Sequence, residues 1–532
     1  MQKKSKLRVL TSAERAIENR KFVLPNPGDM IIMLVFGWAT LCFFLVTVGE
    51  RLLAKLVRIA SSQVVRDALL ESEQALGGVM IVGSIMIILA VIVAAKFPKI
   101  FFPAMVYALT FANAGLKPLH DINLIIKYLG VVFLGAYAAQ SLYKNFWRVL
   151  AIPFPRLMLA YVVWVGVVSL FVGGRTDDNW YIGTEITFML GFSLFWIYDF
   201  NNRFGLEEFH RLLSWGAIAV GITHLMSPLL IDTYLSNGRF QSYWIRATIF
   251  SVTFAPLVVV LFWRAMAEKN PQTAGFFSGA ALIGFALILW SGSRGPSAAT
   301  LIGVVILWWL FRSRLLLVML IFAVLGVAGQ LILSAGSAGG LEMLAGRLQS
   351  TESGRSLIWA EYIKVAMRSP IYGYAQSGMS YAIVSGSSGS GLSDFLSAQG
   401  IKIRTEGVHN SYLGITLRFG LVGLALFMAL VISALAQARR VLFSELIPKE
   451  EKKIVILPTA LIATICSMML FEDFVPGTGK GTVLGFLLYA SIFICQIYGA
   501  RLINEYERVD GKRKPIPTVE GARILAQPSS SI

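Results

Sequence analysis

Residues 412–435 read YLGITLRFGLVGLALFMALVISAL, an apolar stretch interrupted by one charged side chain, Arg418. A helix of about 20 apolar residues crosses the hydrocarbon core of a bilayer, so this stretch predicts a transmembrane helix. The same criterion predicts about 14 spans. The range is 12–14, because the candidates at 100–114 and 297–311 are short and the one at 123–142 contains Lys127. The candidates lie near 31–49, 78–95, 100–114, 123–142, 157–172, 181–200, 214–231, 247–263, 276–293, 297–311, 315–333, 412–435, 454–471 and 481–500.

The composition of the whole chain is that of a membrane protein. Of the 532 residues, 56% are hydrophobic and 14% charged, and the mean hydropathy is +0.68. Soluble domains carry about 25% charged residues, so this composition excludes a soluble globular protein. The predicted fold class is an all-α polytopic integral membrane protein, with the lipid bilayer as its first partner.

The charge distribution predicts the topology. Residues 1–30 are polar and basic before any apolar run, which favours a retained cytoplasmic tail over a cleavable signal peptide. With that tail inside, 14 spans return the chain to the cytoplasm, and 29 of the 47 Lys and Arg residues fall in tails and cytoplasmic loops. The net charge of +17 therefore follows from topology and predicts no nucleic-acid partner. The predicted organisation is a cytoplasmic tail (1–30), a membrane domain (31–500) and a second cytoplasmic tail (501–532).

Two segments depart from the pattern of spans and short loops. Residues 51–72 carry apolar and basic faces, which favours a helix on the outer surface, either a connector or a headgroup-binding element. Residues 334–408 are predicted to form one long polar loop on the outer side of the membrane. Within that loop, Ser353 to Arg368 predicts a short amphipathic helix with Ser353 as its N-cap, ended by Pro370 and Gly373. Its apolar face is expected to consist of Ile358, Tyr362 and Val365, and the Gly/Ser run from Ser385 to Ser393 predicts a hinge.

The histidines and cysteines differ in what their positions predict. His409 stands at the entrance of the 412–435 span, and ionisable groups at a membrane edge tend to be functional. His210 and His120 lie in predicted short loops, where we expect them to be solvated, and His224 lies within a span, where packing explains it. The cysteines fit neither a disulfide nor a metal site, and all three are expected to be small buried residues: Cys42, Cys466 and Cys495.

Several arginines are predicted on the same outer face as His409. Arg294 stands in Ser291-Gly-Ser-Arg-Gly-Pro296, a tight turn between two spans where glycines let backbone amides form an anion-binding nest. Arg239 and Arg246 flank a short outer segment. Arg347 and Arg355 belong to the long loop. For Arg246 and Arg347, snorkelling or a headgroup contact is the favoured explanation.

Guanidinium groups and an imidazole at an outer membrane surface fit one kind of chemistry. Arginine binds phosphate oxygens in a two-pronged fork, and histidine serves as general base for an attacking hydroxyl. The pattern therefore favours displacement of a lipid diphosphate from a sugar. No nucleotide motif is present and arginines suffice to neutralise the leaving group, so we expect neither a cofactor nor a metal. Glu472 and Asp473 are predicted to orient His409 or bind acceptor hydroxyls, or else to be an ordinary membrane-edge pair.

Together these motifs resemble the O-antigen ligase and Wzy-type polysaccharide polymerase superfamily, over about 214–430. The residues that carry the resemblance are Arg239 before a span, Ser293-Arg294-Gly295, Gly354-Arg355-x3-Trp359, Pro370-x2-Gly373, His409-Asn410-x-Tyr412 and Gly420-Leu-Val-Gly423. The resemblance implies a C-type glycosyltransferase-like helical fold in the bacterial inner membrane. It implies a metal-independent enzyme with an undecaprenyl-diphosphate-linked glycan as donor. It also implies donor-diphosphate roles for Arg239 and Arg294, the role of catalytic base for His409, and loop shaping or donor contact by Arg355. Apart from the resemblance, we expect further substrate-binding residues at the outer face: Arg246, Arg347, Asn410, Tyr412, Glu472 and Asp473.

The superfamily performs two reactions, and the sequence leaves both open. A polymerase joins repeat units into an exopolysaccharide or O-antigen, whereas a ligase moves the glycan to lipid A–core. The span count and motif pattern favour a polymerase of the ExoQ-like group, with polysaccharide chain-length and export machinery as further partners. A third alternative is a lipid-linked oligosaccharide flippase. Transporters place polar residues at the midplane, whereas this chain places them at one face, which favours an enzyme.

Overall fold

A computed structural model of the chain describes residues 153–172, 204–226, 247–314, 355–375, 409–472 and 482–509, together with single residues near 102–110, 194–201, 235–240 and 317–321 and at 474. Several expectations lie outside the described residues. They are the spans near 31–49, 78–95 and 123–142, the 51–72 segment, the Ser385 to Ser393 run, His120 and Cys42.

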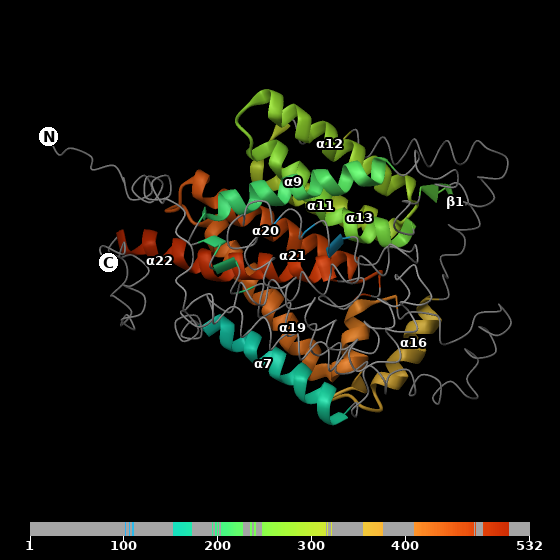
Figure 1. Ribbon diagram of the computed structural model, residues 1–532. Helices are drawn as coiled ribbons and strands as arrows, with labels where there is room; N and C mark the ends of the chain where they lie inside the picture. Colours follow the sequence, from blue (N-terminus) through green and yellow to red (C-terminus); the bar gives the residue numbers. More distant parts are fainter. Residues whose placement is uncertain are drawn as a thin grey trace, which may run out of the picture.

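The described part is helical apart from one small hairpin (Figure 1). Two short strands, β1 (Leu235–Ser236) and β2 (Arg239–Phe240), pair antiparallel. The helices are α7 (Pro153–Val167) with a π-helical continuation η1 (Val168–Val172), α9 (Leu206–Leu225), α11 (Ala247–Ala267), α12 (Pro271–Trp290), α13 (Arg294–Phe311), α16 (Arg355–Ala366), α19 (Ser411–Phe443), α20 (Lys449–Met468), α21 (Thr482–Phe493), the π-helical η3 (Ile494–Tyr498) and α22 (Gly499–Val509).

The described helices confirm a polytopic membrane protein. Five of them are long and apolar enough to cross a membrane, and each overlaps most of a predicted span: Thr248–Ala267, Pro271–Trp290, Arg294–Phe311, Ser411–Phe443 and Val483–Tyr506. A shorter apolar helix, Arg156–Val172, covers the predicted span at 157–172. The total of about 14 spans stays a prediction, because much of the chain lies outside the described residues.

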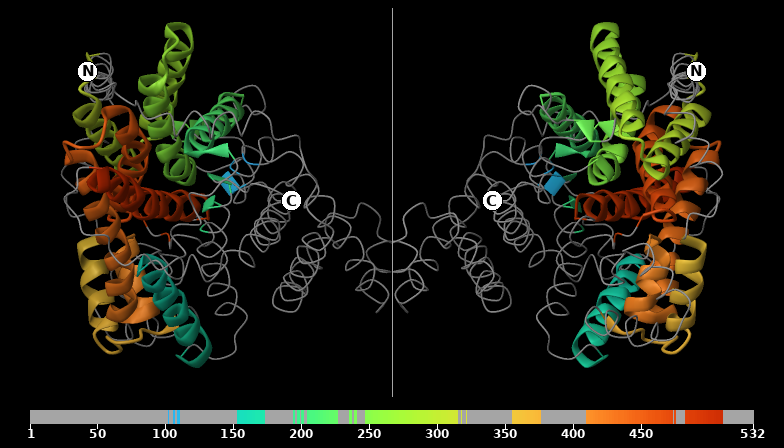
Figure 2. Two further views of the ribbon diagram at one scale, coloured as in Figure 1. Left: turned by 90° about the vertical axis from the view of Figure 1, so that its left-hand side faces the viewer. Right: turned by 90° about the vertical axis from the view of Figure 1, so that its right-hand side faces the viewer.

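Helix α11 is the centre of the larger helix group. It packs against α9, α12, α13 and α20, and 83% of its apolar stretch is buried. Two glycines permit this close packing: a Cβ at Gly284 would lie 2.9 Å from Val258, and a Cβ at Gly303 would collide with Thr464 of α20. The second group consists of α19 with α7 and α16 packed against it (Figure 2).

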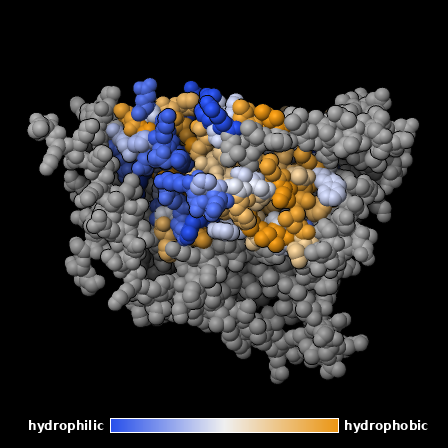
Figure 3. All heavy atoms as spheres, turned by 90° about the horizontal axis from the view of Figure 1, so that it is seen from above, coloured by the Kyte–Doolittle hydropathy of each residue, from blue (hydrophilic) through white to orange (hydrophobic). Residues whose placement is uncertain are grey.

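The two ends of the helices differ in polarity. Figure 3 shows hydrophilic side chains gathered at one end of the described surface, with a hydrophobic zone beyond them, as expected for a chain that passes from water into lipid. Burial and then the carboxylates of Glu505 and Glu207 raise the pKa of Glu451. The starts of α9 and α20 therefore lie near α22.

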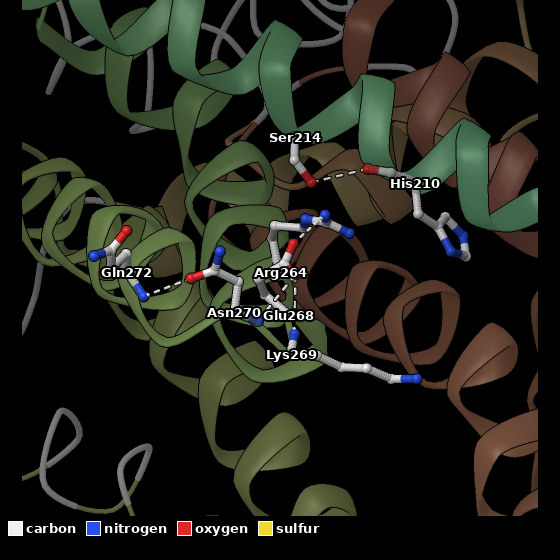
Figure 4. Close-up of polar contacts among 7 residues, drawn as sticks. All are labelled: His210, Ser214, Arg264, Glu268, Lys269, Asn270 and Gln272. Carbon is white, nitrogen blue, oxygen red and sulfur yellow. Dashed lines mark hydrogen bonds and ion pairs between the residues drawn. The ribbon is translucent and has the colours of Figure 1, made fainter.

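The turn between α11 and α12 is held by side-chain hydrogen bonds and an ion pair (Figure 4). Arg264 is paired with Glu268, and the Glu268 carboxylate also accepts the backbone N–H groups of Lys269 at 2.9 Å and Asn270 at 3.3 Å. The Asn270 side chain accepts the N–H of Gln272 at 2.9 Å, so it caps α12, and Pro271 follows at the first helical position.

The expectation that His210 is solvated is wrong. Helix α9 begins at Leu206, before the predicted start of the span at 214, and His210 is 1% exposed. Its ring lies edge-on to Trp263 of α11 with 4.9 Å between centroids. A hydropathy window centred on the apolar residues misses the first two turns of the helix, which include His210. His224 is buried against Phe250 and Phe254, as expected for a packing residue.

Two of the cysteines are free thiols in the described helices. Cys495 is fully buried and Cys466 partly buried, which confirms the prediction that they are small residues in the helix packing.

Candidate functional site

His409 has an unusual backbone conformation at the start of α19. Its φ of 51° lies in the left-handed region, which costs a residue other than glycine about 1–3 kcal/mol. The next residue, Asn410, is extended, and its side chain accepts the N–H of Leu413 at 3.1 Å. This cap fixes the first turn of α19, so the half-buried His409 side chain projects from a rigid helix start.

Ser411 fastens that helix start to the end of α20. Its backbone N–H donates to the carbonyl of Met469 at 2.8 Å, and its hydroxyl donates to the carbonyl of Glu472 at 2.6 Å. The same hydroxyl accepts the N–H of Phe474 at 3.1 Å. Ser411 is fully buried, so these bonds are shielded from water. The segment that carries Glu472 therefore lies directly beside His409 in the fold, although 63 residues separate them.

Tyr412 adds a second connection between the same two helices. Its hydroxyl donates to the carbonyl of Cys466 at 2.9 Å, and its ring lies 6.5 Å from that of Phe427. The bond is partly buried and links α19 to the last turn of α20. This geometry explains Tyr412 as a residue that holds the helix entrance in place.

Arg294 begins α13 at the same end of the bundle. The turn before it contains Gly292 in the left-handed region, with φ of 65°, and the buried N-cap Ser293. The next residue, Gly295, lies against Phe471, which a Cβ at Gly295 would approach to 2.8 Å. The exposed Arg294 side chain therefore starts beside the chain segment to which Ser411 is bound. The N-terminal end of α13 adds the positive end of a helix dipole, which favours a bound anion.

The β-hairpin brings the backbone of Arg239 toward this end. The next residue, Phe240, is 1% exposed, and its ring lies 5.2 Å from Phe250 and 5.8 Å from Trp290. Trp290 is the last residue of α12, four positions before Arg294. Packing of Phe240 thus places Arg239 near the turn that holds Arg294; the Arg239 side chain lies outside the described residues.

Helix α19 is broken at Gly420, which has φ of 69° and a non-helical ψ. The break lies nine residues after Ser411, or about 14 Å along the helix. Residues 370–374 of the long loop fill it: Tyr374 N–H donates to Leu417 O at 2.8 Å, and Leu421 N–H donates to Pro370 O at 2.7 Å.

A third bond across the break comes from α7, where Trp164 Nε1 donates to Phe419 O at 2.8 Å. Backbone groups at membrane depth need partners within the protein, and these three bonds supply them.

Two glycines allow the loop to enter the break. A Cβ at Gly420 would collide with the carbonyl of Ile371, and a Cβ at Gly373 would lie 2.6 Å from the carbonyl oxygen of Leu417. Both glycines have φ near 70°. The Pro370-x2-Gly373 and Gly420-Leu-Val-Gly423 motifs are therefore two halves of one joint. In the sequence they are two separate motifs, and their contact was not predicted.

Arg418 lies at this joint, and sequence reasoning did not select it. Its side chain is only 8% exposed, within a span two residues before Gly420. A buried charged residue at membrane depth is a functional candidate by default. The signal was present as the single charge in residues 412–435.

The long loop forms the predicted helix, with different bounds. Helix α16 covers Arg355–Ala366, and the predicted apolar face is confirmed for Tyr362 and Val365, which are 4% and 6% exposed. Two other apolar side chains are exposed: Ile363 within the helix and Met367 directly after it.

The predicted site residues divide into three groups. The structure gathers His409, Arg294 and the backbone of Glu472 around the end of α20, while Asn410 caps α19 and Tyr412 is bonded to Cys466. The backbones of Arg239 and Arg355 are placed by the hairpin and by α16. Three predicted residues lie outside the described residues: Arg246, Arg347 and Asp473.

Comparison with known proteins places this region in a family. Residues 279–428 match the O-antigen ligase family. The match runs from within α12 to within α19, so it includes Arg294, α16, His409 and the joint at Gly420. No curated protein matches the chain. The family-level resemblance is thereby confirmed, and the ExoQ-like subgroup stays a prediction.

Proposed function

We propose that this chain, whose residues 279–428 belong to the O-antigen ligase family, polymerises the repeat units of a cell-surface polysaccharide at the outer face of the bacterial inner membrane. The donor is an oligosaccharide linked to undecaprenyl diphosphate, and the acceptor is another glycan. One observation carries the proposal. His409 is held in a strained conformation at a helix entrance that is bonded to the α20 end, and Arg294 starts a helix against that same end.

In the proposed reaction, His409 removes the proton from the acceptor hydroxyl. The hydroxyl oxygen forms a bond to the anomeric carbon of the donor sugar while the bond from that carbon to the diphosphate oxygen breaks. Undecaprenyl diphosphate leaves with the electron pair, and the proton stays on the imidazole until it passes to solvent. Arg294 and the N-terminus of α13 stabilise the negative charge on the leaving group.

The other predicted residues serve this reaction in supporting roles. Arg239 contributes a second guanidinium from the hairpin, and Arg355 reaches the donor from α16. Glu472 orients His409 or binds acceptor hydroxyls. The joint at Gly420 supports these roles, because it fixes α16 relative to α19 and so limits where Arg355 can lie.

The family match also favours a second candidate, an O-antigen ligase that transfers the finished glycan to lipid A–core. The polysaccharide made by a strain that lacks this chain distinguishes the two on a gel. Loss of long polymer with intact ligated single units supports a polymerase. Free polymer beside unmodified lipid A–core supports the ligase. If lipid-linked single units are retained on the cytoplasmic leaflet, both are wrong and the chain is a flippase.

Substitution of Arg294 tests the leaving-group role. Arg294→Ala is expected to lower the transfer rate of the purified full chain about 100- to 1000-fold, because it removes a preorganised charge partner. Arg294→Lys keeps the charge but loses the two-pronged fork, so we expect an intermediate rate. Arg312→Ala, at the other end of α13, is the matched control and should transfer glycan at the wild-type rate. Equal rates for Arg294→Ala and the control would exclude the role.

A further inference from the structure

A cavity lies at the end of α19 that is farthest from Ser411. Its volume is about 530 Å³, and its lining consists of Ala436, Arg439, Arg440, Phe443, Ser444 and Ile503. All but Ile503 of α22 come from the end of α19. Figure 1 shows α22 at the opposite end of the molecule from β1 and α16, so the cavity is remote from the candidate site.

Exposed aromatic side chains mark the depth of this cavity in the membrane. Phe443 is 58% exposed, and its ring lies 5.6 Å from that of Trp309, which is 44% exposed and lies near the end of α13. Exposed aromatic rings at the ends of two neighbouring spans are typical of the interface between hydrocarbon and headgroups. The cavity therefore opens at headgroup depth. On the predicted topology this is the cytoplasmic leaflet.

The charges in the cavity are two guanidinium groups that no described carboxylate neutralises. Arg439 and Arg440 are both exposed, and among the residues that the structure describes neither takes part in an ion pair or a side-chain hydrogen bond. Their neighbours at this end differ: Arg264 is paired with Glu268, and Arg501 with Glu505 at 2.8 Å. A general preference for basic residues at this end of the bundle accounts for the two arginines, but not for the cavity that they line.

We propose that this cavity binds the phosphate headgroup of an anionic phospholipid in the leaflet opposite the candidate site. The two guanidinium groups match the phosphate oxygens, and the Ser444 hydroxyl adds a donor. Phe443 and Ile503 provide an apolar wall for the first methylene groups of the acyl chains. A lipid bound there joins the end of α19 to α22, since the lining comes from both helices. The proposal does not depend on glycan transfer.

Native mass spectrometry of the full chain tests this proposal. The chain is released from nanodiscs that contain phosphatidylglycerol and phosphatidylcholine in equal amounts, and the retained lipids are counted. We expect phosphatidylglycerol to be retained in preference. Each guanidinium near an anionic headgroup contributes about five-fold in affinity, so Arg439→Gln with Arg440→Gln should reduce the preference about 25-fold. Arg312→Gln with Arg314→Gln removes the same charge at the end of α13 and should leave the preference unchanged.

Further arms separate this site from its rivals. Ala436→Trp fills the cavity without changing the charge and should lower lipid retention, which keeps the test valid if the double arginine variant fails to fold. Equal losses in the two double variants would show a general effect of charge and overturn the proposal. If the chain retains no lipid from the nanodiscs but binds inorganic phosphate, the cavity is a free-phosphate site and the lipid assignment is wrong. Glycan transfer measured on the same samples reports on the proposed function separately.

Discussion

His409→Ala is expected to lower the rate of glycan transfer at least about 100-fold, because general-base catalysis contributes factors of this size. The effect should appear in the transfer rate, with the melting temperature of the full chain nearly unchanged. The cap that fixes the start of α19 comes from the Asn410 side chain, which the substitution leaves in place. The measurement is transfer by the purified chain from a lipid-linked oligosaccharide to an acceptor glycan.

His409→Asn provides the matched control for backbone conformation. Asparagine tolerates the left-handed region better than most residues but offers no base at neutral pH. Equal loss in the Asn and Ala variants shows that the imidazole, and not the backbone conformation, carries the activity. A transfer rate near the wild-type value in His409→Asn would exclude the base role.

The same substitution has a distinct expected result in cells. Long polymer should be lost while lipid-linked single repeats accumulate in the outer leaflet, because delivery of the donor across the membrane does not need His409. Accumulation in the cytoplasmic leaflet would contradict an enzyme and support a flippase.

Gly420→Ala is expected to destabilise the protein by at least about 3 kcal/mol, because two costs add. Alanine at φ of 69° is strained, and its Cβ would collide with the carbonyl of Ile371 in the docked loop. To relieve the collision, residues 370–374 must leave the break, which exposes the N–H of Leu421 and the carbonyl of Leu417 without partners. Thermal unfolding of the full chain in detergent measures the loss, and the transfer rate should fall with it.

Gly279→Ala is the matched control in α12. A Cβ at Gly279 meets no atom within 4 Å, and alanine is favoured over glycine in a helix by about 1 kcal/mol. We therefore expect Gly279→Ala to melt at or above the wild-type temperature. A Gly420→Ala variant that melts with the wild type would contradict the joint between the loop and α19.

Much of the described fold could be predicted from hydropathy. The spans at 247–263, 276–293, 297–311, 412–435 and 481–500 all coincide with helices. Hydropathy did not place the start of α9, because the buried turn that contains His210 is not apolar in composition; His210 is buried through its contact with Trp263.

The candidate site was less predictable than the fold. Residue type and predicted topology selected His409 and Arg294, and the structure brings their helix starts to one end of α20. The same reasoning assigned substrate contacts to Asn410 and Tyr412, whereas their side-chain bonds are a helix cap and a link to α20. Capping and inter-helix bonds depend on which helix lies beside the residue, which no local pattern records.

Residues 412–435 show which features the sequence alone predicts and which depend on tertiary structure. Their apolar character was enough to predict a membrane span, since transfer into lipid depends on composition over about 20 residues. It did not reveal that the span is broken at Gly420, because a break at membrane depth is stable only when another segment bonds to the freed backbone groups. That segment, residues 370–374, lies about fifty positions earlier in the sequence. Only the folded chain brings it there and fixes the loop helix against α19.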